Sequence, residues 1–238
     1  MVNHKTVDLV VGGPPCQAFS SSGKQLSVLD SRGTLVHEFV QKIDEIKPKV
    51  FLFENVRGLV TARNTEGNPG GVIKDIISQL EELGYSVRAT LLNAADYGSY
   101  QRRVRCFLIG SSAGLAPEIP EPTHSKSNNL LNAKWRSLEE FLAIHAEQND
   151  DLFDFPTEKL MAVLKDIPNG SGIKSPGKPE PTRPNGHWGY RQGTFIADLD
   201  LPARTVTGSA SQDWIRWNGN LRRLTFNEIK ILQGFPED

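Results

Sequence analysis

The sequence predicts an α/β fold, because short apolar runs typical of buried strands alternate with segments whose apolar residues recur at helical spacing. Residues 7–11 and 50–53 are the first two apolar runs, and an amphipathic segment at 33–46 lies between them. A second amphipathic segment follows at 72–83. This strand–helix–strand–helix order is typical of a sheet with helices packed against it, with parallel strands buried inside.

The ends of these elements carry their own signals. The first helix ends before Pro48, and the second ends before Gly84. Residues 85–92 and 104–110 are rich in β-formers and flank a short loop, so an antiparallel pair is one arrangement open to them.

The composition changes after Gly110. Residues 113–134 are rich in proline, serine and asparagine and are typical of a linker, whereas 135–146 predicts an amphipathic helix. Residues 168–187 are rich in proline and glycine and predict an irregular loop region. The part of the chain after Gly110 is therefore expected to contain more irregular structure than the first part.

Length and composition limit the classes of protein. A chain of 238 residues suits one large domain, alone or with a small one, and its net charge of −1 neither advertises nor excludes a nucleic-acid partner. The chain has two cysteines and no sequence pattern that indicates a disulfide between them, which favours a reducing, cytoplasmic setting. We find no signal peptide, no membrane-spanning run and no metal-ligand motif.

One cysteine stands out because of its neighbours. Residues 12–20 read Gly-Gly-Pro-Pro-Cys-Gln-Ala-Phe-Ser and directly follow the first predicted strand. Two prolines stiffen the turn before Cys16, and strand ends are where α/β folds place their chemistry. A lone cysteine is more often a buried structural residue, but such a residue needs no Pro-Pro turn before it. Cys16 is therefore our candidate nucleophile.

Charged residues follow the later strands. Glu54 comes directly after the apolar run 50–53, on the side where Cys16 also emerges, and suits a general acid. Arg103 and Arg105 alternate in a strand-like run, so period two predicts both on one face. Cys106 falls on the other face and is assigned to packing.

These stretches resemble the DNA cytosine-5 methyltransferase family, in the family's own order. The matching motifs lie at 13–20, 30–35, 53–56, 97–105, 202–207 and 222–236. They anchor residues 7–110 and 201–238, and the middle matches nothing specific.

The resemblance implies part of a Rossmann-like, S-adenosylmethionine-dependent methyltransferase sheet, with a smaller irregular target-recognition domain. We expect a partial catalytic domain over 1–112, and a target-recognition region with the late conserved block over 113–238. The family's early glycine-rich donor turn and its last motif have no counterpart here. We therefore expect a fragment, a split subunit or a degenerate protein, which alone neither binds the donor well nor methylates DNA.

The resemblance also implies roles for the candidate residues. Cys16 would attack carbon 6 of cytosine, and Glu54 would act at ring nitrogen 3. Arg105 would serve the flipped base and its neighbouring carboxylate, and Arg103 would lie near the phosphate backbone. The methyl donor would be S-adenosylmethionine, with two residues lining its pocket: Pro15 and Leu35.

The implied main partner is double-stranded DNA, and a complementary polypeptide could supply the missing motifs. Polar residues of the nucleophile loop would contact it: Gln17, Ser20 and Ser22. The basic C-terminal part would add phosphate contacts: Arg204, Arg216, Arg222 and Arg223. Alternatively, these arginines only pair with nearby acids: Asp198, Asp200, Asp213 and Glu228.

We therefore predict a DNA (cytosine-5-)-methyltransferase acting on DNA in a bacterial or archaeal cell, as the modification arm of a restriction–modification system. A catalytically inactive DNA-binding module of the same fold is the alternative, although it would have no need for Cys16. An RNA substrate is possible but less favoured. A cysteine hydrolase is poorly supported, because the five histidines are scattered.

Overall fold

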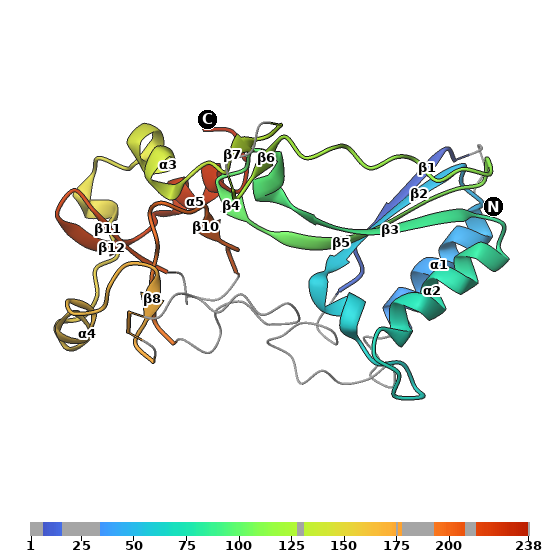
Figure 1. Cartoon of the computed structure of the whole chain (residues 1–238), viewed down its shortest axis with the longest axis horizontal. Coiled ribbons are helices and arrows are strands. Elements are labelled where there is room, and N and C mark those ends of the chain that lie inside the picture. Colours follow the sequence, from blue (N-terminus) through green and yellow to red (C-terminus); the bar gives the residue numbers. More distant parts are fainter. Residues whose placement is uncertain are drawn as a thin grey trace. The chain divides into compact units, whose positions relative to one another are not determined.

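The computed structural model describes residues 7–15, 34–127, 131–174, 176–177, 193–207 and 213–237. They form two compact units (Figure 1). Unit 1 comprises the described residues up to Leu92 together with 104–121, and unit 2 comprises 93–103 together with those from Pro122 onward. The expected division into a catalytic and a recognition region stays a prediction.

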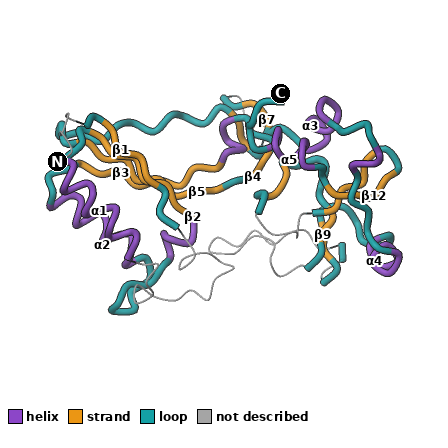
Figure 2. The backbone as a smooth tube through the Cα atoms, turned by 180° about the vertical axis from the view of Figure 1, so that it is seen from behind, coloured by secondary structure: helices purple, strands orange, loops and turns teal. Residues whose placement is uncertain are grey.

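Unit 1 is built on a four-stranded sheet in the order β1-β2-β5-β3. The strands are β1 (Leu9–Gly12), β2 (Val50–Val56), β3 (Ser86–Asn93) and β5 (Val104–Ser111). β1 runs parallel to β2, and β2 runs antiparallel to β5. β3 and β5 are neighbours, so their predicted pairing is confirmed. Figure 2 shows these strands in orange.

Two helices pack together against this sheet, α1 (Thr34–Ile46) and α2 (Gly71–Glu82) (Figure 1). Both match the predicted segments to within a residue or so. Ile43 of α1 and Leu80 of α2 are fully buried, as their helical spacing requires. Gly84 follows α2 with a positive φ of 91°, a conformation that glycine adopts without strain.

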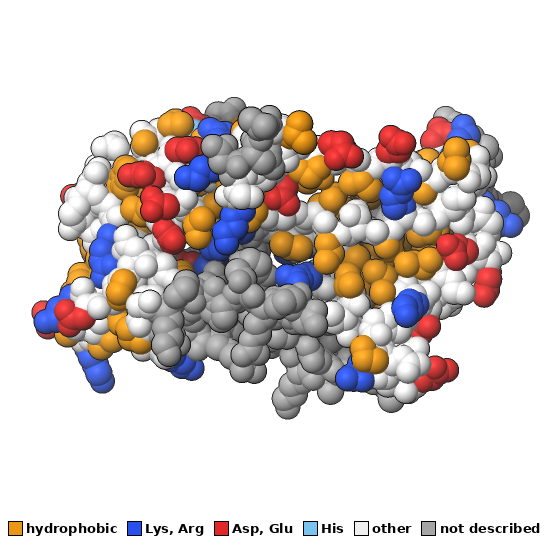
Figure 3. Space-filling model, in the orientation of Figure 1, with side chains coloured by type: hydrophobic (Ala, Val, Ile, Leu, Met, Phe, Trp, Pro, Cys, Tyr) orange, Lys and Arg blue, Asp and Glu red, His pale blue; other side chains and the backbone are white. Residues whose placement is uncertain are grey.

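The strands of unit 1 have two different faces. In β2, Phe51 and Phe53 are fully buried in the core shared with the helices, whereas the alternate residues are half-buried. In β1 the outward side chains are Leu9 and Val11, which are 54% and 62% exposed. The expectation that residues 7–11 form a buried strand is therefore wrong for this face. Figure 3 shows apolar side chains gathered on the surface of unit 1.

β2 also extends further than predicted. The apolar run suggested a strand ending at residue 53, but pairing with β5 continues to Val56, which lies opposite Arg105. Glu54 therefore lies within the strand and not beyond it. The difference arises because cross-strand pairing, and not side-chain polarity, decides where a strand ends.

Unit 2 contains smaller elements. Its sheets have the orders β12-β11-β9-β8, β10-β4 and β6-β7. The strands are β4 (Gln101–Arg102), β6 (His124–Ser125), β7 (Ala133–Lys134), β8 (Ser171–Gly172), β9 (Phe195–Ile196), β10 (Ala203–Arg204), β11 (Trp214–Trp217) and β12 (Asn220–Arg223). The helices are α3 (Leu138–His145), α4 (Glu158–Leu164) and α5 (Phe226–Leu232). Sequence reasoning predicted α3, although with a start three residues too early, and missed α4, α5 and the sheets.

Each helix of unit 2 begins at a hydroxyl side chain that accepts a backbone hydrogen bond. Ser137, Thr157 and Thr225 are the caps. At α5 the cap is reciprocal, because Glu228 also accepts from the backbone N–H of Thr225. The described residues of the two units also contain short 3-10 helices, at Arg57–Thr61 in unit 1 and at Ala94–Tyr97 and Asp150–Leu152 in unit 2. Among the described residues, no helix is both long and apolar enough to cross a bilayer.

Candidate active site

An ion pair between Glu54 and Arg105 lies on the half-buried face of the unit 1 sheet. The register places Glu54 opposite Phe107 and Val56 opposite Arg105, so Glu54 and Arg105 are diagonal neighbours on one face. Arg105 Nε lies 2.9 Å from Glu54 Oε1. The Arg105 side chain is 18% exposed, and that of Glu54 is 37% exposed. The pair thus leaves carboxylate oxygen accessible to a ligand.

The opposite face of the same strand confirms the assignment of Cys106 to packing. Its side chain lies in the core, where it is 1% exposed. Burial, together with the negative charge of Glu54, raises the pKa of the Cys106 thiol to about 11. Cys106 is therefore a neutral thiol at physiological pH and is unsuited to nucleophilic chemistry.

The described part of the predicted nucleophile turn lies beside β2. Asn55 Nδ2 donates a hydrogen bond to the carbonyl oxygen of Pro14, at 3.1 Å. A Cβ atom placed on Gly13 would lie 3.4 Å from Glu54 Oε2. The turn that leads toward Cys16 therefore passes close to the Glu54 carboxylate, although Cys16 itself lies outside the described residues.

Arg103 does not share a strand with Arg105. β5 begins at Val104, and Arg103 lies between β4 and β5, where its carbonyl accepts a hydrogen bond from Ala94 N at 3.0 Å. The prediction that period two places both arginines on one strand face is therefore wrong. The physical reason is a break in the strand, which ends the alternation. The neighbouring Arg102 donates through Nε to the Pro202 carbonyl, at 3.1 Å.

Two residues were predicted to line the donor pocket, and both are described. Pro15 is exposed after the end of β1, and Leu35 is half-buried in the first turn of α1. Both side chains are apolar, so they fit one wall of a pocket and leave its polar contacts to other groups. Of the predicted DNA contacts in the nucleophile loop, Gln17, Ser20 and Ser22 lie outside the described residues.

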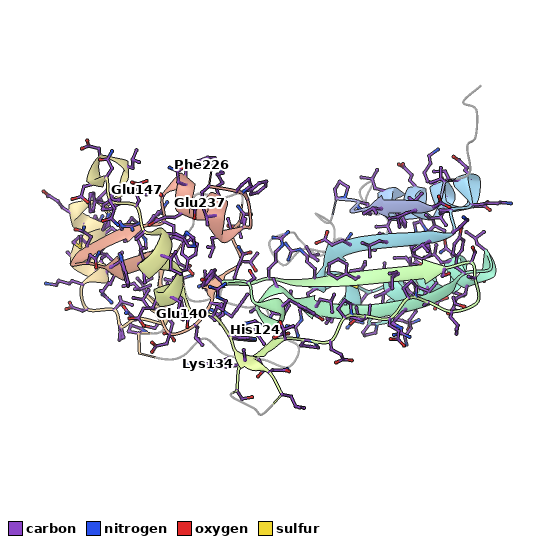
Figure 4. The ribbon with its side chains drawn as sticks, turned by 90° about the horizontal axis from the view of Figure 1, so that it is seen from above. His124, Lys134, Glu140, Glu147, Phe226 and Glu237 are labelled. Carbon is purple, nitrogen blue, oxygen red and sulfur yellow. The ribbon has the colours of Figure 1, made fainter. Side chains whose placement is uncertain are left out.

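Arg222, a predicted DNA contact, is buried. It is 1% exposed and donates to both carboxylate oxygens of Glu228, at 2.8 and 2.7 Å. Its guanidinium also lies over the Phe153 ring, 4.2 Å from the ring centroid. Glu228 accepts a further bond from the backbone N–H of Glu147, labelled in Figure 4. The prediction of a phosphate contact by Arg222 is therefore wrong, because its donors face the interior of unit 2.

The other C-terminal arginines also contact acidic or polar groups. Arg204 Nε lies 3.4 Å from Asp213 Oδ2, and Arg223 Nε lies 3.5 Å from Asp154 Oδ2. Arg216 donates to Asn169 Oδ1 at 2.8 Å. Pairing with nearby acids, the alternative considered from the sequence, is confirmed for Arg204 with Asp213 and for Arg222 with Glu228. Arg204 and Arg223 remain partly exposed, at 23% and 25% of their side chains.

Sequence reasoning missed Asn55. It is 2% exposed and connects β2 to the Pro-Pro turn, a contact between residues far apart in the chain. A signal was present, because an amide that follows Glu54 in an otherwise apolar strand needs partners when it is buried. The described residues contain no cluster of side chains suited to a metal ion.

Comparisons with known proteins show the family of this chain. The model of the C-5 cytosine-specific DNA methylase family matches residues 2–238. Type II methyltransferase M1.HphI of Haemophilus parahaemolyticus is 34% identical over 243 residues, which cover 100% of this chain and 61% of that protein. Type II methyltransferase M1.ScrFI of Lactococcus lactis subsp. cremoris is 46% identical over 234 residues, covering 97% of this chain and 54% of that protein. The chain thus spans little more than half of these relatives.

Solved structures share the fold. The Entamoeba histolytica methyltransferase EhMeth aligns with a TM-score of 0.59 at 18% identity, over 97% of this chain and 66% of its own. The S. pombe Dnmt2 methyltransferase aligns with a TM-score of 0.57 at 15% identity, over 97% of this chain and 67% of its own. The predicted α/β methyltransferase fold is confirmed.

Proposed function

Since this chain belongs to the C-5 cytosine-specific DNA methylase family, we propose that it carries the nucleophile and general acid of a DNA (cytosine-5-)-methyltransferase. Its two relatives above are named Type II methyltransferases, which favours the modification arm of a restriction–modification system. The carrying observation is the accessible Glu54 carboxylate, held by Arg105 beside the Pro-Pro turn that precedes Cys16.

The proposed reaction begins with the Cys16 thiolate, which adds to carbon 6 of cytosine and forms a C–S bond. Glu54, after its accessible carboxylate has taken up a proton from water, donates that proton or a strong hydrogen bond to ring nitrogen 3, so the electron pair of the double bond becomes available at carbon 5. Carbon 5 would then form a bond to the methyl carbon of a sulfonium donor, whose sulfur–methyl bond breaks so that the donor leaves as a neutral thioether. Loss of the carbon 5 proton to a base re-forms the double bond, the thiolate leaves, and nitrogen 3 returns its proton to Glu54.

Arg105 has two roles in this proposal. Its guanidinium fixes the orientation of the Glu54 side chain, because Nε lies 2.9 Å from Oε1. Arg105 Nη1 also donates to the Val104 carbonyl, at 2.9 Å, and the second role that we assign to this guanidinium is contact with a carbonyl oxygen of the base. Arg103, in unit 2, is assigned to the phosphate backbone and not to the base.

S-adenosylmethionine would supply an electrophilic methyl group. Pro15 and Leu35 would form an apolar wall of its pocket, since Pro15 is exposed just after β1 and Leu35 is half-buried in the first turn of α1. The polar contacts of the donor are assigned to groups other than these two side chains.

Methylation at carbon 5 requires the target cytosine to leave the duplex. We assign contacts near the target to residues of the nucleophile loop: Gln17, Ser20 and Ser22. Arg204 and Arg223 remain candidates for phosphate contacts, because both are partly exposed. Arg222 does not belong to this set, because its side chain is buried. An inactive DNA-binding module is less favoured, since such a protein would have no need for a paired, accessible carboxylate.

A complementary polypeptide is a further part of the proposal. The outward face of β1 presents Leu9 and Val11, and β1 ends the sheet of unit 1 among the described residues. An apolar strand at a sheet edge favours association with another chain segment. The complex would act on DNA in the cytoplasm of a bacterial or archaeal cell.

The test is methylation of DNA in cells. Residues 1–238 are expressed alone and as a chimaera, in which they replace the matched segment of M1.ScrFI. We expect 5-methylcytosine at one defined sequence by bisulfite sequencing in cells that express the chimaera, and none with its Cys16→Ser variant. Unmethylated DNA with a soluble, folded chimaera would contradict the proposed function.

A further inference from the structure

We infer that Asn55 is a positioning residue, which holds the Pro14 carbonyl and thereby the turn that leads to Cys16. The inference rests on the proposed function, because it concerns the approach of Cys16 to the base. The contact that carries it is the hydrogen bond from Asn55 Nδ2 to Pro14 O, at 3.1 Å. It joins the end of β2 to the turn after β1, across 41 positions in the sequence.

The need for this contact follows from the strand ladder. β1 pairs with β2 only as far as Gly12 opposite Phe53. Beyond that point Pro14 and Pro15 have no backbone N–H, so the turn cannot continue a regular parallel ladder. The Pro14 carbonyl still needs a hydrogen-bond donor, and the Asn55 side chain supplies it.

Both halves of the Asn55 amide are used. Its Oδ1 accepts from the backbone N–H of Val56 at 2.9 Å, while Nδ2 donates to Pro14. The residue is 2% exposed, so little water is present to replace either bond. An aspartate would retain the acceptor and lose the donor. The site therefore requires an amide, and a carboxylate of the same shape cannot replace it.

Gly13 lies beside Glu54, because a Cβ atom placed on Gly13 would lie 3.4 Å from Glu54 Oε2. Gly13 has no side chain to make that contact, so the hydrogen bond from Asn55 to Pro14 is the one that carries the positioning of the turn. A catalytic group displaced by about 1 Å can lose about 100-fold in rate, so a loosened turn should slow attack by Cys16.

The experiment compares Asn55→Asp with a matched control, Asn64→Ala. Asn64 is another buried asparagine of unit 1, 8% exposed, which donates to Asp75 Oδ2 at 3.2 Å and accepts from the backbone N–H groups of Glu66 and Asn68. Both variants are made in the chimaera. The probe is a randomised DNA duplex in which every cytosine is 5-fluorocytosine, incubated with S-adenosylmethionine. The readouts are the rate of covalent adduct formation, the dissociation constant for DNA and the melting temperature.

We expect Asn55→Asp to slow adduct formation about 10- to 100-fold, while DNA affinity changes by less than about threefold. Asn64→Ala should lower the melting temperature and leave the adduct rate of the folded protein unchanged. An unchanged rate in Asn55→Asp, or equal rate losses in both variants, would overturn the positioning role and leave the proposed function intact. If the unsubstituted chimaera forms no adduct, the proposed function fails, and the positioning role fails with it.

Discussion

Arg105 and Arg222 show how differently two arginines of this chain are used. Both bond a glutamate, at 2.9 Å in unit 1 and at 2.7 and 2.8 Å in unit 2. The partner of Arg105 is 37% exposed, whereas Arg222 and Glu228 are each 1% exposed. An ion pair that keeps an accessible carboxylate can bind a ligand, but one sealed in a core can only serve the fold.

The comparison explains why charge alone was a poor guide in unit 2. Basic residues clustered in the C-terminal sequence predicted phosphate contacts, but each described member contacts an acid or amide within unit 2. Burying a charged pair is costly unless its donors and acceptors are all hydrogen-bonded. The Glu228 carboxylate accepts from Arg222 and from the backbone N–H of Thr225 in the capping box of α5. Arg222 and its partner Glu228 therefore serve the fold, whereas Arg204 and Arg223 stay partly exposed.

Glu54→Gln should have the largest effect on function. We expect turnover by the chimaera to fall by about two to four orders of magnitude, because an amide cannot deliver a proton to the ring. DNA affinity should stay nearly unchanged. Single-turnover methylation and DNA binding titrations check both quantities, and equal losses in the two would make Glu54 a binding residue.

Arg222→Met should instead destabilise the fold, by about 3–5 kcal/mol, because it leaves the buried Glu228 charge without its partner. Urea unfolding of the chain measures this loss. The double variant Arg222→Met, Glu228→Gln should regain part of it, since no buried charge remains while the amide oxygen still accepts backbone bonds. A single variant as stable as the unsubstituted chain would mean that the pair is not buried in solution.

Arg105→Ala should change unfolding free energy by less than about 1 kcal/mol, because its partner is substantially exposed. Turnover should fall about 100-fold, as expected when a charged donor is removed from a reacting site. Arg103→Ala should reduce DNA affinity more than turnover. Identical patterns for both variants would indicate an undifferentiated electrostatic patch.

The smallest expected effect concerns the reactivity of the Cys106 thiol toward an alkylating reagent. With a pKa of about 11, roughly one thiol in a thousand is ionised at pH 8, so iodoacetamide should label Cys106 very slowly. Unfolding, or a pH above about 11, should release this protection. Peptide mass spectrometry over a pH series separates it from Cys16, and rapid labelling of Cys106 at pH 8 would contradict its burial.

Sequence patterns predicted best where the fold depends on local spacing. The helices α1 and α2 follow from apolar residues on one face, and Cys106 follows from strand alternation. The sequence could not predict the hydrogen-bond partner of Asn55. Its contact with Pro14 depends on the register between two strands that are far apart in the chain. The predictions for Arg103 and Arg222 were wrong for related reasons. The strand break at Arg103 and the buried partner of Arg222 both depend on tertiary pairing, which local sequence patterns do not contain.

Covalent trapping tests the assignment of chemistry to the strand ends of unit 1 most directly. The chimaera is incubated with S-adenosylmethionine and the 5-fluorocytosine duplex, then digested and analysed by mass spectrometry. We expect a nucleotide adduct on the peptide that contains Cys16, which is lost in Cys16→Ser and retained in Cys106→Ser. An adduct of unchanged yield in Cys16→Ser, or one attached to Cys106, would contradict the assignment.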